Sequence, residues 1–323
     1  MLLLRDPVFV DHATPEGHPE CPARAQVVAA ALEGAPGVHA VRPACAGDEA
    51  DLVRVHDPGY VASLRGPTGP RGRALDPDTF LSPRSFEVAL AATGTVCAGL
   101  DAVLAAGAAV DVRAGAGADA DRRAFAVVRP PGHHARPDRA MGFCLFNHVA
   151  VAAARARAVH GVERVAVLDF DVHHGNGTQE AFWRDGSVFF TSLHRDRFYP
   201  GSGHADETGE GPGRGTTLNL PLPGATKPAA YLEALARACE AVVAFRPGVL
   251  LVSAGFDAYR RDPVGGLGLS AEHYAAIGAA LRQAADACAG GRLLAVLEGG
   301  YALEALGGLV RAFVAGVEGL PPG

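Results

Sequence analysis

Acids and histidines follow an apolar run in the stretch VLDFDVHHGNG, residues 167–177. In an extended segment, side chains alternate between two faces, so Asp169, Asp171 and His173 share one face. Carboxylates and a neutral imidazole are ligands for divalent cations, and Asp257, after a separate apolar run, completes a set of three. Three protein ligands with one open position are typical of a catalytic metal. The alternative is a buried acid cluster satisfied by backbone amides.

A histidine pair, His133-His134, follows two prolines and a glycine, a sequence that predicts a rigid loop holding both rings at the floor of a pocket. Such rings need acceptors that fix their tautomers, and Asp169 and Asn176 are the candidates. An aspartate partner favours the imidazolium, whereas an asparagine orients the ring without adding charge. His174 points to the opposite face of its segment, and we interpret it as structural.

Aromatic side chains accompany these motifs. Tyr301 follows two glycines after an apolar run, so its phenol is a candidate donor to a developing oxyanion, with core packing as the alternative. Phe143, Phe198 and Tyr199 lie in glycine-rich segments and are expected to wall a narrow apolar channel.

Apolar, β-rich runs alternate with alanine-rich segments of helical length. The expected strands are Ala124–Val128, Arg164–Phe170, Ser187–Leu193, Gly248–Ala254 and Leu293–Leu297. The expected helices are Ser85–Ala106, Phe146–Val159, Ala229–Phe245 and Ser270–Ala289, with Ser82 and Ser270 as candidate caps. This alternation predicts an α/β fold with a central, mainly parallel sheet between two helical layers. Ligands of such sheets bind at the carboxyl ends of the strands, and the five expected strands end at the histidine pair, residues 169–173, Ser192–His194, Asp257 and Tyr301.

Composition limits the remaining possibilities. The 323 residues are 49% hydrophobic and are expected to form one domain, 1–323. A formal charge of −6 argues against nucleic-acid binding. The apolar stretch Ala89–Val110 contains Asp101 and is expected to be a buried helix, so no membrane span is predicted. The opening MLLLRDPVFV lacks a signal-peptide pattern, and six cysteines without a CxxC pair fit reduced thiols in a cytoplasmic protein.

Six motifs, in order, resemble the histone deacetylase superfamily: RPPGHHA, MGFCLFNHVAVAA, DFDVHHGNGTQ, SLH…FYPGSG, SAGFDA…DP and LEGGY. The resemblance is nearest to class II deacetylases and to bacterial histone-deacetylase-like or acetylpolyamine amidohydrolases, and it implies the fold that arginases and deacetylases share. HPECPAR, at His18–Arg24, also resembles the family's opening motif, whose arginine lies by an internal cavity proposed for acetate exit.

The resemblance implies a role for each matching position. Asp171, His173 and Asp257 would bind zinc, with ferrous iron as the alternative ion. His134 would act as general base and then acid, with His133 giving electrostatic support. The remaining catalytic positions would be Tyr301, which polarises the substrate carbonyl, Asp169, which pairs with the first histidine, and Asn176, where class I enzymes have aspartate.

The same resemblance extends to a second ion and to the substrate channel. A structural potassium ion would be held by Asp169, Asp171, His173, Ser192 and Leu193. Channel positions would be Gly142, Phe143, Phe198, Tyr199 and, at the gate, Val264.

The implied reaction is hydrolysis of an acetamide on an amine, with acetyl-lysine or an acetylated polyamine as substrate. Polyamine-selective relatives carry a glutamate at the gate, so Val264 weakens a polyamine preference, whereas three acids within residues 203–211 favour a cationic substrate.

Two alternatives remain open from the sequence. An arginase-like ureohydrolase with two manganese ions needs more carboxylates than Asp171 and Asp257 offer. A catalytically silent protein that binds acetylated amines is the other alternative, although every expected catalytic position is filled. The physiological substrate and the formation of a homo-oligomer are left open.

Overall fold

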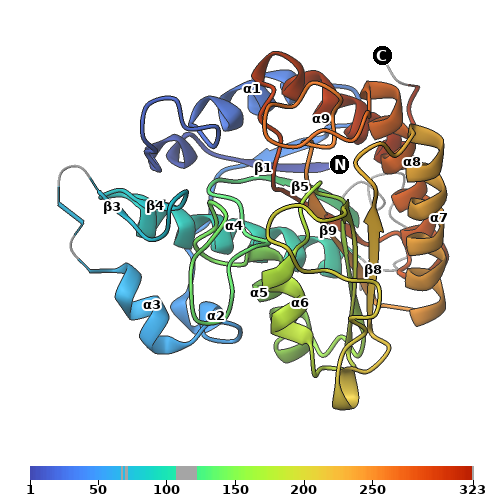
Figure 1. The fold of residues 1–323 in the computed structure, drawn as a ribbon, viewed down its shortest axis with the longest axis horizontal. Helices are drawn as coiled ribbons and strands as arrows, with labels where there is room; N and C mark the ends of the chain where they lie inside the picture. Colours follow the sequence, from blue (N-terminus) through green and yellow to red (C-terminus); the bar gives the residue numbers. More distant parts are fainter. Residues whose placement is uncertain (67, 70–71, 107–121, 322–323) are drawn as a thin grey trace.

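The computed structural model describes residues 1–66, 68–69, 72–106 and 122–321. Their main feature is an eight-stranded sheet in which all neighbouring strands run parallel (Figure 1). In spatial order the strands are β2 (Ala40–Arg42), β1 (Leu2–Arg5), β5 (Arg123–Val127), β10 (Leu293–Leu297), β9 (Val249–Ala254), β6 (Val165–Asp169), β7 (Val188–Arg195) and β8 (Thr217–Leu222). The predicted mainly parallel sheet is therefore confirmed.

Helices cover both faces of this sheet, which gives the three layers predicted from the sequence (Figure 1). One layer contains α1 (Ala23–Leu32), α7 (Pro228–Phe245), α8 (Ala271–Cys288) and α9 (Leu303–Glu318). The opposite layer contains α4 (Ser85–Ala105), α5 (His148–Ala158) and α6 (Asn176–Phe182). Smaller elements are η1 (Pro7–Asp11), α2 (Glu49–Leu52), α3 (Pro58–Leu64), η3 (Gly211–Gly213) and an antiparallel hairpin of β3 (Arg73–Ala74) and β4 (Phe80–Leu81).

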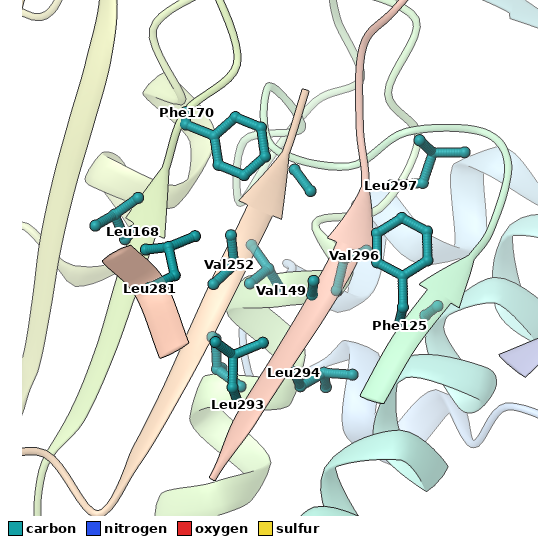
Figure 2. Packing of buried hydrophobic residues seen from close by; sticks show 14 of the residues in the cluster. Phe125, Val149, Leu168, Phe170, Val252, Leu281, Leu293, Leu294, Val296 and Leu297 are labelled. Carbon is teal, nitrogen blue, oxygen red and sulfur yellow. The ribbon is translucent and has the colours of Figure 1, made fainter. Parts of the chain in front are cut away.

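The core is formed where the two helical layers meet the sheet. Leu168, Val252 and Val296 lie on three adjacent strands, and Val149 of α5 and Leu281 of α8 belong to the same cluster (Figure 2). All five side chains are fully buried. Central strands buried on both faces read as continuous apolar runs, which is why the five expected strands were found within a few residues of their observed bounds.

Helix α4 has the length and hydropathy of a membrane span, but 61% of its most apolar window is buried inside the protein. The expected buried helix over Ala89–Val110 is confirmed as far as Ala105, and residues 107–110 lie outside the described residues.

One of the two expected helix caps is present and the other is not. Ser270 is the N-cap of α8, where its backbone N–H donates to the His273 ring. Ser82 is not a cap. Its hydroxyl lies 2.8 Å from the Ser85 hydroxyl and accepts from the Ala13 backbone N–H, so it ties α4 to the amino-terminal segment instead.

A close crossing between α8 and α9 depends on glycine. A Cβ atom at Gly316 would lie 2.0 Å from the Ala275 carbonyl oxygen, whereas one at Gly308, on the same helix, would meet nothing within 4 Å.

We expect Gly316→Ala to lower the free energy of unfolding by about 1–3 kcal/mol through overpacking. Gly308→Ala should raise it by up to about 1 kcal/mol through helix propensity. Urea denaturation measures both, and equal stabilities would contradict the observed crossing.

Candidate active site

The functional side chains come from the carboxyl ends of five neighbouring strands. The histidine pair follows β5, Tyr301 follows β10, Asp257 follows β9, Asp171 and His173 follow β6, and Phe198 and Tyr199 follow β7. Because these strands are parallel and adjacent in the order β5-β10-β9-β6-β7, their ends meet at one edge of the sheet. Segments far apart in the sequence thereby form one site.

Asp171, His173 and Asp257 form a buried cluster whose ligand atoms all lie within 4.8 Å of one another. His173 Nδ1 is 3.0 Å from Asp171 Oδ1 and 3.1 Å from Asp257 Oδ2. A Cβ atom at Gly255 or Gly299 would lie 2.2 Å from one of these carboxylates, so both glycines are needed for the acids to approach.

The chemistry of this cluster fits a divalent cation. Two fully buried carboxylates repel each other, and burial together with the charge of Asp171 raises the pKa of Asp257 to about 7. A divalent cation relieves this repulsion, and two oxygens with one imidazole nitrogen form a suitable donor set. Within the described residues, this is the group of three that could hold a metal.

The adjacent histidines have different partners and different charges. His133 Nδ1 lies 2.9 Å from Asp169 Oδ2, and His134 Nδ1 lies 2.7 Å from Asn176 Oδ1. Burial lowers the pKa of His133, but Asp169 and Asp171 outweigh burial and raise that pKa to about 10. Burial and the neighbouring His133 hold the pKa of His134 well below 6.5. At neutral pH His133 is therefore the cation and His134 the free base.

Tyr301 lines the same cavity as His134 and His173, with its ring 5.7 Å from Phe143 in an edge-to-face contact. Burial raises the pKa of its phenol well above 10, so the hydroxyl keeps its proton and can donate. Behind it, the guanidinium of the fully buried Arg24 lies 4.8 Å from the Tyr301 ring centroid and donates to the Gly300 and Glu298 carbonyls.

A narrow cavity of about 200 Å³ leads to these groups. It is lined by Asp78, His134, Gly142, Phe143, His173, Phe198, Tyr199, Val264 and Tyr301, a set that includes all five expected channel positions. The Phe198 ring stacks on His173 at 5.2 Å, and the Tyr199 ring meets His134 edge-on at 5.1 Å. A Cβ atom at Gly142 would lie 2.4 Å from the His134 ring, so this wall requires glycine.

The residues expected to hold potassium lie together at the ends of β6 and β7. Asp169 and Ser192 are paired in register, and the side chains of both, like that of Leu193, are fully buried. The Ser192 hydroxyl lies 2.9 Å from His194 Nδ1.

His174 lies apart from the metal-ligand cluster. Its Nδ1 is 2.8 Å from the Ser202 hydroxyl and its Nε2 is 3.0 Å from Gln179 Oε1. These contacts fit its interpretation as a structural residue.

The acidic loop at 203–211 does not present three free charges. Glu207 accepts from the backbone N–H groups of Gly203 and His204, and Glu210 forms an ion pair with Arg184. Two of the three acids therefore have partners within the protein, and the attraction of a cation by this loop stays a prediction.

The sequence analysis assigned no role to two acids of the site. Asp78 lines the channel, and the fully buried Glu298 accepts from the backbone N–H groups of Gly132 and His133 through Oε2. Glu298 directly follows an expected strand and stands in the LEGGY motif, but its bonds to two backbone amides of another loop could not be read from that position. Asp78 lies in a loop whose path no local pattern predicts.

The buried Asp-His-Asp cluster at the carboxyl edge of an α/β/α fold fits a metal-dependent enzyme. Comparison with known proteins narrows this class. The histone deacetylase domain matches residues 18–317, and the chain belongs to this family. It is accordingly an enzyme, a hydrolase acting on amide bonds.

Three relatives illustrate the similarity. A histone deacetylase-like amidohydrolase of Pseudomonas aeruginosa is 43% identical over 81% of this chain and 66% of its own length. A probable deacetylase of Methanothermobacter thermautotrophicus is 41% identical over 99% of this chain and 91% of its own. The crystal structure of an acetylpolyamine aminohydrolase from Burkholderia pseudomallei superposes with a TM-score of 0.81 at 31% identity, covering 98% of both chains.

The metal cluster can be tested without measuring activity. We expect added Zn²⁺ to raise the melting temperature, with about 2.7 kcal/mol of stabilisation at a free concentration one hundred times Kd. Asp257→Asn replaces a charged ligand by a neutral amide, so it should abolish this gain. Differential scanning fluorimetry measures the shift, and the exposed Asp206→Asn is the matched control. An undiminished gain in Asp257→Asn would contradict the ligand assignment.

Proposed function

We propose that this enzyme is a zinc-dependent deacetylase that hydrolyses the acetamide of acetylated amines, releasing acetate and the free amine. One observation carries the proposal. The metal-ligand cluster, the neutral His134 and the protonated Tyr301 converge at one narrow cavity with aromatic walls. A cavity of about 200 Å³ suits an extended alkyl chain with a small acyl group at its end.

Asp171, His173 and Asp257 would hold the catalytic ion, with ferrous iron as the alternative to zinc. When bound, the ion would supply positive charge that polarises the acetyl carbonyl and acidifies a water molecule. Asp169, Asp171, His173, Ser192 and Leu193 would hold potassium, because oxygen donors at the paired strand ends suit a hard cation.

His134 is the proposed proton carrier. Its Nδ1–H donates to the Asn176 amide oxygen, which leaves Nε2 as the free acceptor. His134 takes a proton from water at Nε2 as water attacks the acetyl carbon, and it returns this proton to the leaving nitrogen when the C–N bond breaks. The cationic His133, held by Asp169, favours the negative charge that develops nearby.

Tyr301 is the proposed oxyanion donor. Its protonated hydroxyl donates to the acetyl oxygen as that oxygen gains charge, a contact typically worth about 3 kcal/mol in the transition state. Arg24, beneath the ring, binds two carbonyls of the loop that carries Tyr301 and so supports it from inside the protein.

The substrate is proposed to be acetyl-lysine in proteins or an acetylated small amine. Val264 gives the channel an uncharged wall, which does not select for a polyamine. Asp78, on the same channel, offers a carboxylate to an N–H group or a cation. The Burkholderia relative is named as an acetylpolyamine aminohydrolase and the Pseudomonas relative as a histone deacetylase-like amidohydrolase, so relatives of both kinds are similar to this chain.

Further proposals concern the domain organisation, the cellular location and the partners of the enzyme. We propose one deacetylase domain over residues 1–323 in the cytoplasm, where the six cysteines, all free among the described residues, would stay reduced. The negative net charge of −6 supports the absence of a nucleic-acid partner. The proposal includes no membrane partner and leaves homo-oligomer formation open.

The function is tested on a substrate panel. Zinc-loaded wild type should hydrolyse at least one member of a panel of acetyl-lysine peptides, acetylspermidine, acetylputrescine and acetylcadaverine, measured as released acetate. The matched control, Tyr301→Phe, should keep wild-type zinc affinity but lose about 100-fold or more in kcat. Release of urea from arginine with no acetamide cleaved would refute the proposal.

The pH dependence of kcat/KM tests whether His134 is the base. His134 must be neutral to accept a proton, so kcat/KM should fall when acid protonates it. Asn176→Asp places a negative charge beside His134 and raises its pKa. The acidic limb of the kcat/KM profile should therefore move to higher pH, by about one pH unit or more.

The control for this experiment is Gln283→Glu, which adds the same charge at an exposed position of α8. Its profile should match wild type. An acidic limb that Asn176→Asp leaves in place would show that His134 is not the titrating base.

A further inference from the structure

One carboxylate joins the channel wall to the loop that carries Tyr301. Asp262 Oδ1 accepts from the backbone N–H groups of Val264 at 2.9 Å and Gly265 at 3.1 Å. Its Oδ2 accepts from those of Tyr301 at 2.7 Å and Ala302 at 3.2 Å. Four backbone donors from two loops therefore meet on one half-buried side chain.

The loop that ends in Tyr301 needs such an acceptor. Gly300 has a φ of 119°, a backbone conformation that side-chain-bearing residues rarely adopt, so the chain reaches Tyr301 through a flexible residue. Helix α9 then begins at Leu303 with Ala302 as its N-cap, and an alanine side chain offers no oxygen to the first amides. Asp262 Oδ2 accepts instead from the N–H groups of Tyr301 and Ala302, directly before the first turn of this helix, and its negative charge is favourable at a helix amino terminus.

The other loop that Asp262 binds, the one that contains Val264 and Gly265, lies at the cavity. Val264 and Tyr301 both line the narrow cavity that contains His134 and His173. Gly265 lies so close to the Asp257 backbone that a Cβ atom there would be 2.4 Å from the Asp257 carbonyl oxygen. The Asp262 segment is therefore fixed against the strand end that carries a proposed metal ligand, and it provides a stable support for Tyr301.

We propose that Asp262 is a positioning residue that sets the Tyr301 hydroxyl over the reacting carbonyl and couples it to the channel wall at Val264. The proposal rests on the proposed deacetylase function. Asp262 touches neither substrate nor metal in this assignment and acts through the Tyr301 backbone. Displacing a catalytic group by about 1 Å can cost a factor on the order of 100 in rate, so its loss should be measurable.

The central variant is Asp262→Asn. Its amide nitrogen cannot accept, so one of the two pairs of backbone N–H groups loses its acceptor and meets another donor. We expect kcat to fall about 10- to 100-fold, while the zinc Kd, measured by chelator competition, stays within about twofold of wild type. The matched control is Asp57→Asn, because Asp57 accepts from two backbone N–H groups at the start of α3 in the same way. It should leave kcat unchanged.

A double-mutant cycle separates positioning from general loss of structure. If Asp262 acts through the Tyr301 hydroxyl, Asp262→Asn should cost almost nothing further in a Tyr301→Phe background. If Asp262→Asn does not fold, Asp262→Glu replaces it in the cycle, because it keeps the charge but displaces the oxygens by one methylene.

The role of Asp262 and the proposed function would be overturned by different results. Additive losses, or an Asp262 variant with wild-type kcat, would overturn the role of Asp262 while leaving the proposed function intact. A wild-type enzyme inactive on every acetamide of the panel would overturn the proposed function and, with it, this role.

Discussion

The concentration of buried carboxylates at one edge of the sheet is the constraint on which this structure depends. Asp169, Asp171, Asp257 and Glu298 are all fully buried, and such groups are costly unless they are compensated. Backbone amides provide part of the compensation: Asp171 accepts from the Gly299 N–H, and Asp257 accepts from the Val172 N–H. Burial and the charge of Asp171 raise the pKa of Asp257 to about 7, although the hydrogen bond and charge of His173 oppose this rise. The cluster therefore favours a cation and ties the surrounding loops together.

The same electrostatics separates two neighbouring histidines into different roles. His133 and His134 have ring centroids 4.0 Å apart, so they cannot both be charged at low cost. Asp169 holds the charge on His133, and the Asn176 amide, which carries no charge, orients His134. A carboxylate and an amide, 7 positions apart in the sequence, thus create a cation and a base at adjacent positions. Paired groups whose pKa values are pushed apart are a general sign of acid–base chemistry.

The sequence predicted the part of the site that follows central strands. Alternation in an extended segment was the reason to expect Asp171 and His173 together, although β6 ends at Asp169 and both residues follow it. The strand-end rule brought Asp257 and Tyr301 beside them. Among the elements that were not predicted are strands β1, β4 and β8 and helix α9. Contacts between loops were not predicted. The four amides on Asp262 and the two on Glu298 come from segments whose meeting depends on tertiary packing, so no local pattern reports them.

The size of a cavity is a poor guide to the chemistry of this molecule. A cavity of about 790 Å³ beside α6, lined in part by Arg136, Glu180 and Trp183, is several times larger than the cavity of about 200 Å³ at the candidate active site. Its arginines form ion pairs, Arg136 with Glu180 and Arg184 with Glu210, so it offers no concentration of uncompensated charge. The smaller cavity contains groups with strongly shifted pKa values, His134 and Tyr301. Charges act more strongly in a buried site of low dielectric constant, so a narrow channel over the buried charged cluster suits amide hydrolysis better than the larger cavity does.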